Sequence, residues 1–117
     1  MNAPQAALVW CPFPDVVAAR EVAGQLLEEE LIACANILPA IESVFIWDGA
    51  VSTASECAVL FKTSADRLNR AVEQLGELHP YDTPAIIGWR CDAAHPKTLQ
   101  WLADTFDDDE DSGPPDS

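Results

Sequence analysis

The chain has 117 residues, of which 20 are acidic and 6 are lysine or arginine, so its formal net charge is −14. A hydrophobic fraction of 49% is too high for a disordered chain, and the length suits a single domain. The shortage of basic residues argues against DNA, RNA or an anionic membrane surface as a partner. Residues 107–117 contain six acids and no base, so they are predicted to form a disordered acidic tail. Residues 1–106 form the predicted domain, with a net charge of −8.

We expect a cytoplasmic protein, because no segment has the features of a secretory signal or of a membrane span. Residues 1–5 lack basic side chains, and the apolar run that follows them ends at Pro12 and Pro14. No window reaches the roughly 20 apolar residues that a membrane helix needs. No C-x-x-C pair is present, and we expect reduced thiols at the four cysteines, Cys11, Cys34, Cys57 and Cys91.

The first predicted elements are a strand and a helix. Residues 6–11 form a short apolar run, which is typical of a strand covered on both faces. Asp15 is placed to cap a helix that fades near Glu30, and the apolar residues between them recur at helical spacing.

A hairpin is predicted next. Its first strand begins near Cys34 and contains Pro39, which has no N–H to donate and so marks an edge, a bulge or a bend. Asp48-Gly49 is a strong signal for a two-residue turn, and the returning strand runs to Lys62.

The last part of the chain predicts a helix, a strand and a second helix. Residues 63–66 have the spacing of a capping box and precede an amphipathic segment. A loop at residues 79–84 is constrained by two prolines, and residues 85–91 form the fourth predicted strand. Pro96 suits the first position of a final helix that packs Leu99, Leu102 and Phe106.

This order of elements predicts an α+β fold, a ferredoxin-like β-α-β-β-α-β sandwich with an extra C-terminal helix and the sheet order 4-1-3-2. In such a fold both helices of the repeat cover the same face of the sheet. The second and third strands are nevertheless apolar on both faces, which is more than one helical layer can cover. We therefore expect a closed homo-oligomer.

The sequence resembles the CutA divalent-cation tolerance family over about residues 6–105. The resemblance is carried by matched segments in the family's order and spacing, at residues 31–39, 43–49, 62–63, 79–81 and 101–102 and at Glu56, Pro84 and Leu99. It implies a compact homotrimer with an architecture like that of PII signalling proteins. It also implies a role in divalent metal ion tolerance, without enzymatic turnover.

Cys11 and His79 are the candidate metal ligands. In the predicted topology the first strand runs toward the end where the second helix finishes, so both residues should lie at the same end of the sandwich. Thiolate and imidazole suit copper or zinc. The resemblance implies copper or another divalent cation as the ion, with no organic cofactor, although some relatives have a further His where Leu78 stands. The alternative is that Cys11 is a small buried side chain and that carbonyls satisfy His79.

A second hypothesis is a small-molecule cleft between subunits, as a PII-like sensor or scaffold would need. Aromatic walls with one acid and one base could hold a small zwitterion or anion. The alternative is that the tryptophans bury interface area and that the acid and the base pair across it. The candidate residues are Trp47, Glu56, Lys62, His79, Tyr81 and Trp101.

We expect no enzymatic activity. A catalytic cysteine needs a nearby base, and the second histidine, His95, immediately precedes Pro96 at the start of a predicted helix. No order of Cys, His and Asp in the chain resembles a known nucleophilic site. The other three cysteines are therefore interpreted as buried structural residues.

Overall fold

The first apolar run forms the strand β1 (Ala6–Phe13), and the computed structural model describes residues 4–106 of the chain. β1 pairs with β3 (Ala50–Ser64) on one side and with β4 (Ile87–Arg90) on the other, and β2 (Cys34–Trp47) pairs with β3. All pairs are antiparallel, and the order β2-β3-β1-β4 is the predicted order read from the other edge. The predicted acidic tail, residues 107–117, lies outside the described residues.

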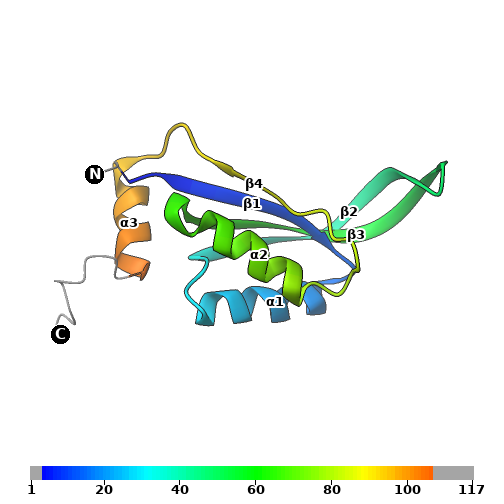
Figure 1. The fold of residues 1–117 in the computed structure, drawn as a ribbon, viewed down its shortest axis with the longest axis horizontal. Helices are drawn as coiled ribbons and strands as arrows, with labels where there is room; N and C mark the ends of the chain where they lie inside the picture. The colour runs from blue at the N-terminus through cyan, green and yellow to red at the C-terminus, as the bar shows by residue number, and fades with distance from the viewer. Residues whose placement is uncertain (1–3, 107–117) are drawn as a thin grey trace.

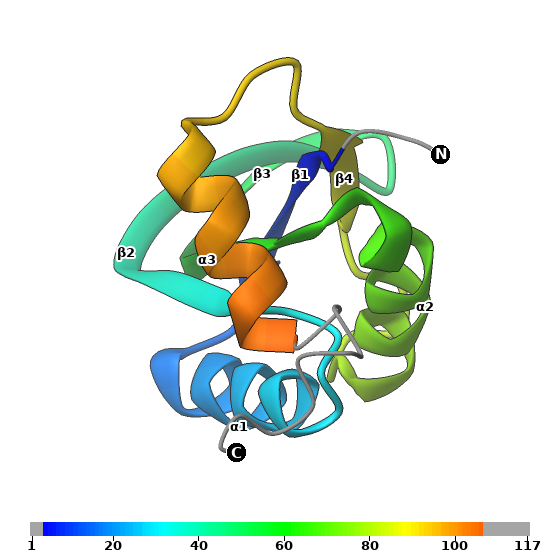
Figure 2. The same cartoon turned by 90° about the vertical axis from the view of Figure 1, so that its left-hand side faces the viewer.

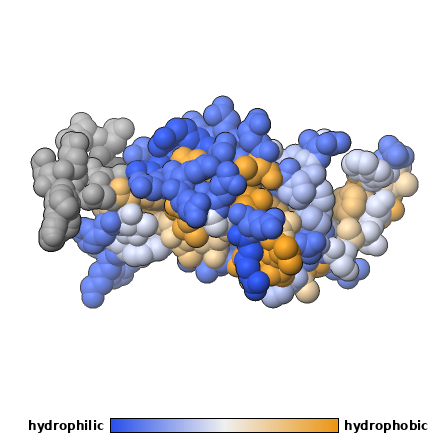
Figure 3. Space-filling model, turned by 90° about the horizontal axis from the view of Figure 1, so that it is seen from below, coloured by the Kyte–Doolittle hydropathy of each residue, from blue (hydrophilic) through white to orange (hydrophobic). Residues whose placement is uncertain are grey.

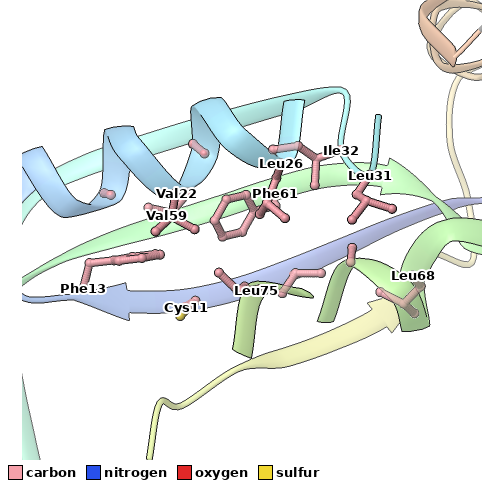
Figure 4. Close-up of a cluster of buried hydrophobic side chains, with 14 of the residues drawn as sticks. Cys11, Phe13, Val22, Leu26, Leu31, Ile32, Val59, Phe61, Leu68 and Leu75 are labelled. Carbon is pink, nitrogen blue, oxygen red and sulfur yellow. The ribbon is translucent and has the colours of Figure 1, made fainter. Parts of the chain in front are cut away.

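Two helices, α1 (Val16–Glu28) and α2 (Leu68–Leu78), cover one face of this sheet (Figures 1 and 2). The α1 cap forms as predicted, since the Asp15 carboxylate accepts a hydrogen bond of 2.8 Å from the backbone N–H of Ala18. The buried core lies between the helices and the sheet, as the close-up in Figure 4 shows. Alternate β1 residues, Ala7, Val9, Cys11 and Phe13, point into it, because successive side chains of a strand face opposite sides.

The capping box predicted at residues 63–66 is wrong. β3 continues to Ser64, and the chain enters α2 through a short 3-10 turn, η1 (Ala65–Arg67). Thr63 is fully buried, and its hydroxyl donates a hydrogen bond of 2.8 Å to the carbonyl oxygen of Leu31. A buried carbonyl without a hydrogen-bond partner costs about 1–3 kcal/mol. The Thr63 hydroxyl satisfies the Leu31 carbonyl and thereby links the α1–β2 connection to β3.

The β2–β3 hairpin projects beyond both helices (Figure 1). The register of β2 against β3 shifts between Leu38 and Ile41, so the chain is irregular at or beside Pro39, and a bulge is one of the three features that this proline predicted. Asp48 and Gly49 have φ angles of 52° and 79°, the left-handed values that a tight hairpin turn requires. Orange atoms mark apolar side chains on the hairpin at the right-hand end of Figure 3, and four of its residues are 64–70% exposed: Val44, Ile46, Trp47 and Val51.

The last helix, α3 (Pro96–Phe106), lies at the opposite end of the molecule from the hairpin tip (Figure 1). As predicted, it buries Leu102 and Phe106, which pack with Ala6 at the start of β1. The guanidinium of Arg67 lies over the Phe106 ring, 3.8 Å from its centroid. Within residues 4–106, no helix combines the length and the hydropathy needed to cross a bilayer.

Candidate functional site

Cys11 and His79 lie at the same end of the sandwich, as the predicted topology requires. Cys11 is near the end of β1, and His79 follows α2 directly. The His79 ring stacks on Phe13, with 4.4 Å between ring centroids, and its Nε2 lies 2.8 Å from the carbonyl oxygen of Pro12. The end of β1 therefore holds the imidazole through both its backbone and an aromatic side chain.

Both ring nitrogens of His79 already have partners. Nδ1 accepts a hydrogen bond of 3.1 Å from the backbone N–H of Tyr81, which leaves the ring proton on Nε2 to be donated to Pro12. Burial lowers the pKa of His79, while the hydrogen bond to Pro12 and the charge of Glu56 oppose that shift. The imidazole is thus neutral at pH 7, and neither nitrogen is open to a ligand without losing a hydrogen bond.

Cys11 is fully buried and also uses the carbonyl of Pro12, to which its thiol donates over 3.4 Å. Burial raises the pKa of this thiol to about 12, and the negative charge of Glu56 adds to the effect. The residue is therefore a neutral thiol at pH 7, whereas metals bind the thiolate. Among residues 4–106, no three His, Cys, Asp or Glu side chains converge in a way that could hold a metal ion.

This donor set does not complete a metal site within residues 4–106. Structural zinc takes four ligands and catalytic zinc takes three protein ligands, but Cys11 and His79 supply two. In this conformation the contacts of Cys11 and His79 match the alternative to a metal site: Cys11 is a buried thiol, and the His79 imidazole is hydrogen-bonded to a carbonyl.

Three of the predicted cleft residues converge beside the same end. The Tyr81 hydroxyl donates a hydrogen bond of 2.8 Å to the carboxylate of Glu56, and the Tyr81 ring lies 4.8 Å from the His79 ring. Burial raises the pKa of Tyr81 to about 12, with further contributions from the hydrogen bond to Glu56 and from its charge. Trp47 faces them from the hairpin across a groove of about 810 Å³.

The groove runs between the hairpin and the loop that connects α2 to β4. The loop contributes one wall through five residues between positions 80 and 85. Alternate residues of the hairpin contribute the opposite wall, because alternate residues of two paired strands lie on the same face. The lining consists of Pro12, Ser43, Phe45, Trp47, Ser52, Ala54, Glu56, Pro80, Tyr81, Asp82, Thr83 and Ala85.

The other three predicted cleft residues do not line the groove: His79 lies behind Tyr81, against its ring, and Lys62 and Trp101 lie elsewhere in the chain. Lys62 pairs across the sheet with Leu8 and Cys34, six residues along β3 from Glu56. Trp101 belongs to α3, at the far end of the molecule, where it is 40% exposed. Within one chain, therefore, the predicted base does not reach the predicted acid.

The predicted set of cleft residues left out Phe45 and Asp82, which line the groove. A usable signal was present for Phe45, since it lies two residues before Trp47 on a strand and so shares its face. Asp82 carried no such signal, because only the folded path of the proline-containing loop brings it opposite the hairpin.

Comparison with known proteins finds relatives along nearly the whole domain. A divalent-cation tolerance protein CutA of Pyrococcus horikoshii is 39% identical over 95 residues, which cover 81% of this chain and 92% of the relative. A chloroplastic CutA 1 protein of rice is 36% identical over 95 residues, also covering 81% of this chain. The chain spans about half the length of that plant relative, 54%.

The expectation of a cytoplasmic protein is corrected by these relatives. The rice protein and another from Arabidopsis thaliana are named chloroplastic, and a CutA of Archaeoglobus fulgidus whose structure is solved is named periplasmic. The last is 29% identical, with a TM-score of 0.81 over 86% of this chain and 98% of its own. These named relatives are assigned to compartments other than the cytoplasm, so the cytoplasmic expectation is not supported.

The fold and the sequence identify the same family. The crystal structure of a divalent ion tolerance protein CutA1 from Ehrlichia chaffeensis superposes with a TM-score of 0.84 at 36% identity, covering 90% of this chain and 98% of that one. The family described as CutA1 divalent ion tolerance protein matches residues 7–105. The chain belongs to the CutA1 divalent ion tolerance protein family.

Proposed function

We propose that the chain acts in divalent-cation tolerance by binding copper or another soft divalent cation, with Cys11 and His79 as ligands. The observation that supports this role is that the two soft donors of a cation-tolerance domain lie side by side at one end of β1, where both contact the carbonyl of Pro12. Imidazole and thiolate favour copper and zinc over magnesium or calcium.

Binding at this place has identifiable costs. Cys11 must lose the proton that its raised pKa retains, and His79 must exchange a hydrogen bond for the metal. At least one further ligand must come from outside residues 4–106, since no third donor converges with these two in the part of the chain that the structure describes. We expect binding to be strongly pH-dependent for these reasons.

A homotrimer is part of the same proposal. The hairpin exposes apolar residues at its tip, and no strand of residues 4–106 pairs with the outer side of either edge strand, β2 or β4. A closed ring of copies would pair these edges and bury the hairpin, and closed symmetry is the common solution for such surfaces.

The metal proposal is tested by titrating the reduced protein with Cu(I) and with Zn(II) and measuring the heat of binding by calorimetry. Cys11→Ser and His79→Gln are each expected to weaken metal binding by about tenfold or more, because each substitution removes a side chain that contacts the metal directly. The matched control is Cys91→Ser. Cys91 is a half-buried cysteine at the other end of β1, where its backbone N–H donates a hydrogen bond to the carbonyl oxygen of Ala6. Unchanged affinity in both ligand variants, with native melting temperatures, would refute the assignment.

A second function, the binding of a small ligand by a PII-like sensor, is favoured by one observation. Trp47, Glu56 and Tyr81, which were predicted as cleft residues, line a single groove. The chemistry of that groove decides what it could bind.

A further inference from the structure

The turn between α1 and β2 is held in a strained conformation at Glu30. This residue follows the cap of α1 and has a φ angle of 59°, in the left-handed region where helices commonly end on glycine. A Cβ atom makes that region unfavourable, and only glycine adopts it without this cost. The turn closes back on α1, since the N–H groups of Glu30 and Leu31 both donate hydrogen bonds of 3.0 Å to carbonyl oxygens in its last turn. Strain of this kind persists where contacts from the surrounding structure hold it.

Arg67 supplies such a contact from a distant part of the chain. It belongs to η1, and its Nε donates a hydrogen bond of 2.9 Å to the carbonyl oxygen of Glu30, 37 residues earlier. Nη1 of the same guanidinium lies 3.4 Å from the hydroxyl oxygen of Ser64, at the end of β3. The Arg67 side chain is 12% exposed, so neighbouring groups enclose most of it. Because a guanidinium is planar and its donors have a fixed geometry, a contact on one side of it orients the others.

The same guanidinium contacts the C-terminal helix. It lies 3.8 Å from the centroid of the Phe106 ring, at the buried end of α3. Phe106 and Leu102 form a small cluster with Ala6, apart from the main core, and Ala33 packs against this cluster just after the turn. A cavity of about 820 Å³ lies between α3, η1 and the end of β4. The helix therefore rests on a few side chains at its end of the molecule (Figures 1 and 2).

We propose that Arg67 is a clasp that couples the docking of α3 to the conformation of the α1–β2 turn. Docked α3 fixes the guanidinium over Phe106, and the fixed guanidinium holds the carbonyl of Glu30 in place. When α3 lifts, Arg67 loses the ring that orients it, and the strain at Glu30 then favours opening of the turn. All these contacts lie within one chain, so the clasp does not depend on which surfaces the homotrimer buries.

The consequence of the clasp is a link between the C-terminal helix and an edge of the sheet. The turn leads directly into β2, where the N–H of Ala33 donates a hydrogen bond of 2.8 Å to the carbonyl oxygen of Lys62. β2 is an edge strand, and the proposed homotrimer uses that edge. Docking of α3 thus sets how firmly the start of β2 is held, which is a role separate from the metal ligands.

Hydrogen–deuterium exchange of the full chain, in its native assembly, tests the coupling. Phe106→Leu keeps an apolar side chain but removes the ring beneath the guanidinium, so amides of residues 30–34 should exchange about tenfold faster although the substitution is in α3. Arg67→Met should have at least the same effect. Phe106→Leu should then add little in the Arg67→Met background, because both substitutions act through one clasp.

Two references make this result specific. Amides of β1, which lies in the main core, should keep their protection in every variant. Arg20→Met removes an exposed arginine of α1 and should leave residues 30–34 unchanged. Unchanged exchange of the turn in Phe106→Leu, additive effects in the double variant, or an equal loss of protection in β1 would each overturn the clasp.

A further variant tests the strain itself. Glu30→Gly removes the cost of the left-handed conformation, so the turn should exchange about threefold more slowly than in the wild type. In that background Arg67→Met should still speed the exchange of α3 but should have a much smaller effect on the turn. An equal effect of Arg67→Met on the turn with Glu30 and with glycine at this position would contradict the proposal that the clasp holds a strained residue.

Discussion

At the residue scale, one backbone carbonyl organises the end of the domain. Pro12 accepts hydrogen bonds from both Cys11 and His79, and the N–H of Tyr81 fixes the tautomer of that imidazole. Tyr81 in turn reaches Glu56. The sequence predicted the shared end of Cys11 and His79 from topology alone, but it could not predict these contacts, because they depend on a carbonyl and an N–H that every residue type carries.

The ionisation of Tyr81 can be read directly, because it is the only tyrosine in the chain. We expect its absorbance at 295 nm to titrate with a pKa of about 12. Glu56→Gln should lower this pKa part of the way toward 10, since it removes the charge of Glu56 but not the burial. The folded state should lose stability as the pH rises above 10, because the unfolded chain releases the phenolic proton first. A wild-type midpoint near 10 would contradict the Tyr81–Glu56 contact.

At the element scale, the hairpin turn signal and the Asp15 cap were informative, whereas the cap signal at residues 63–66 was not. Asp48-Gly49 and Pro39 act through backbone geometry within a few residues, so the hairpin turn and an irregularity of the strand at Pro39 were predicted correctly. The alternating burial of β1 was not predicted, since its apolar run indicated a strand covered on both faces. Thr63 had the spacing of a cap but is used across the fold, by the carbonyl of Leu31. Tertiary burial overrides a local hydrogen bond when a distant carbonyl would otherwise lack a partner.

Two glycines form a matched test of how α2 packs on β4. A Cβ at Gly88 would approach Leu68 Cδ1 to 2.8 Å and the carbonyl oxygen of Leu8 to 3.3 Å, so Gly88→Ala should destabilise the fold by about 1–3 kcal/mol. Gly24, inside α1, has nothing within 4 Å of such a Cβ, and Gly24→Ala should stabilise it by about 0.5–1 kcal/mol. Chemical unfolding at one protein concentration measures both. Equal effects of the two substitutions would show that the close approach at Gly88 does not limit packing.

At the scale of the whole molecule, the domain leaves a surface that its own helices do not cover. The order of elements predicted this surface, because two helices on one face cannot bury a hairpin that is apolar on both sides. Which residues of different copies meet depends on how the copies are arranged, and a single sequence does not encode that in any local pattern. Lys62 and Trp101, which were predicted to share a cleft between subunits with Glu56, do not line the groove within one chain.

Charge on the hairpin tests the proposed homotrimer. Val51 is 70% exposed near the tip, and Val51→Glu should dissociate the assembly to monomers, because burying an unpaired carboxylate costs several kcal/mol. Val17→Glu is the control, since Val17 is 64% exposed on α1 and away from the hairpin. Sedimentation velocity reads the mass of each. A wild-type monomer, or a trimer that survives Val51→Glu, would contradict a hairpin-mediated assembly.

The central claim, a metal bound through Cys11, is tested most directly by the pH dependence of zinc affinity, measured by competition with a chelator between pH 6.5 and 8 in wild type and in Cys11→Ser. The pKa of about 12 keeps this thiol protonated throughout that range, so each bound zinc must release its proton. The affinity of the wild type should rise about tenfold per pH unit, and that of Cys11→Ser should be weaker and nearly flat. Equal affinities and equal slopes in the two proteins would contradict the claim.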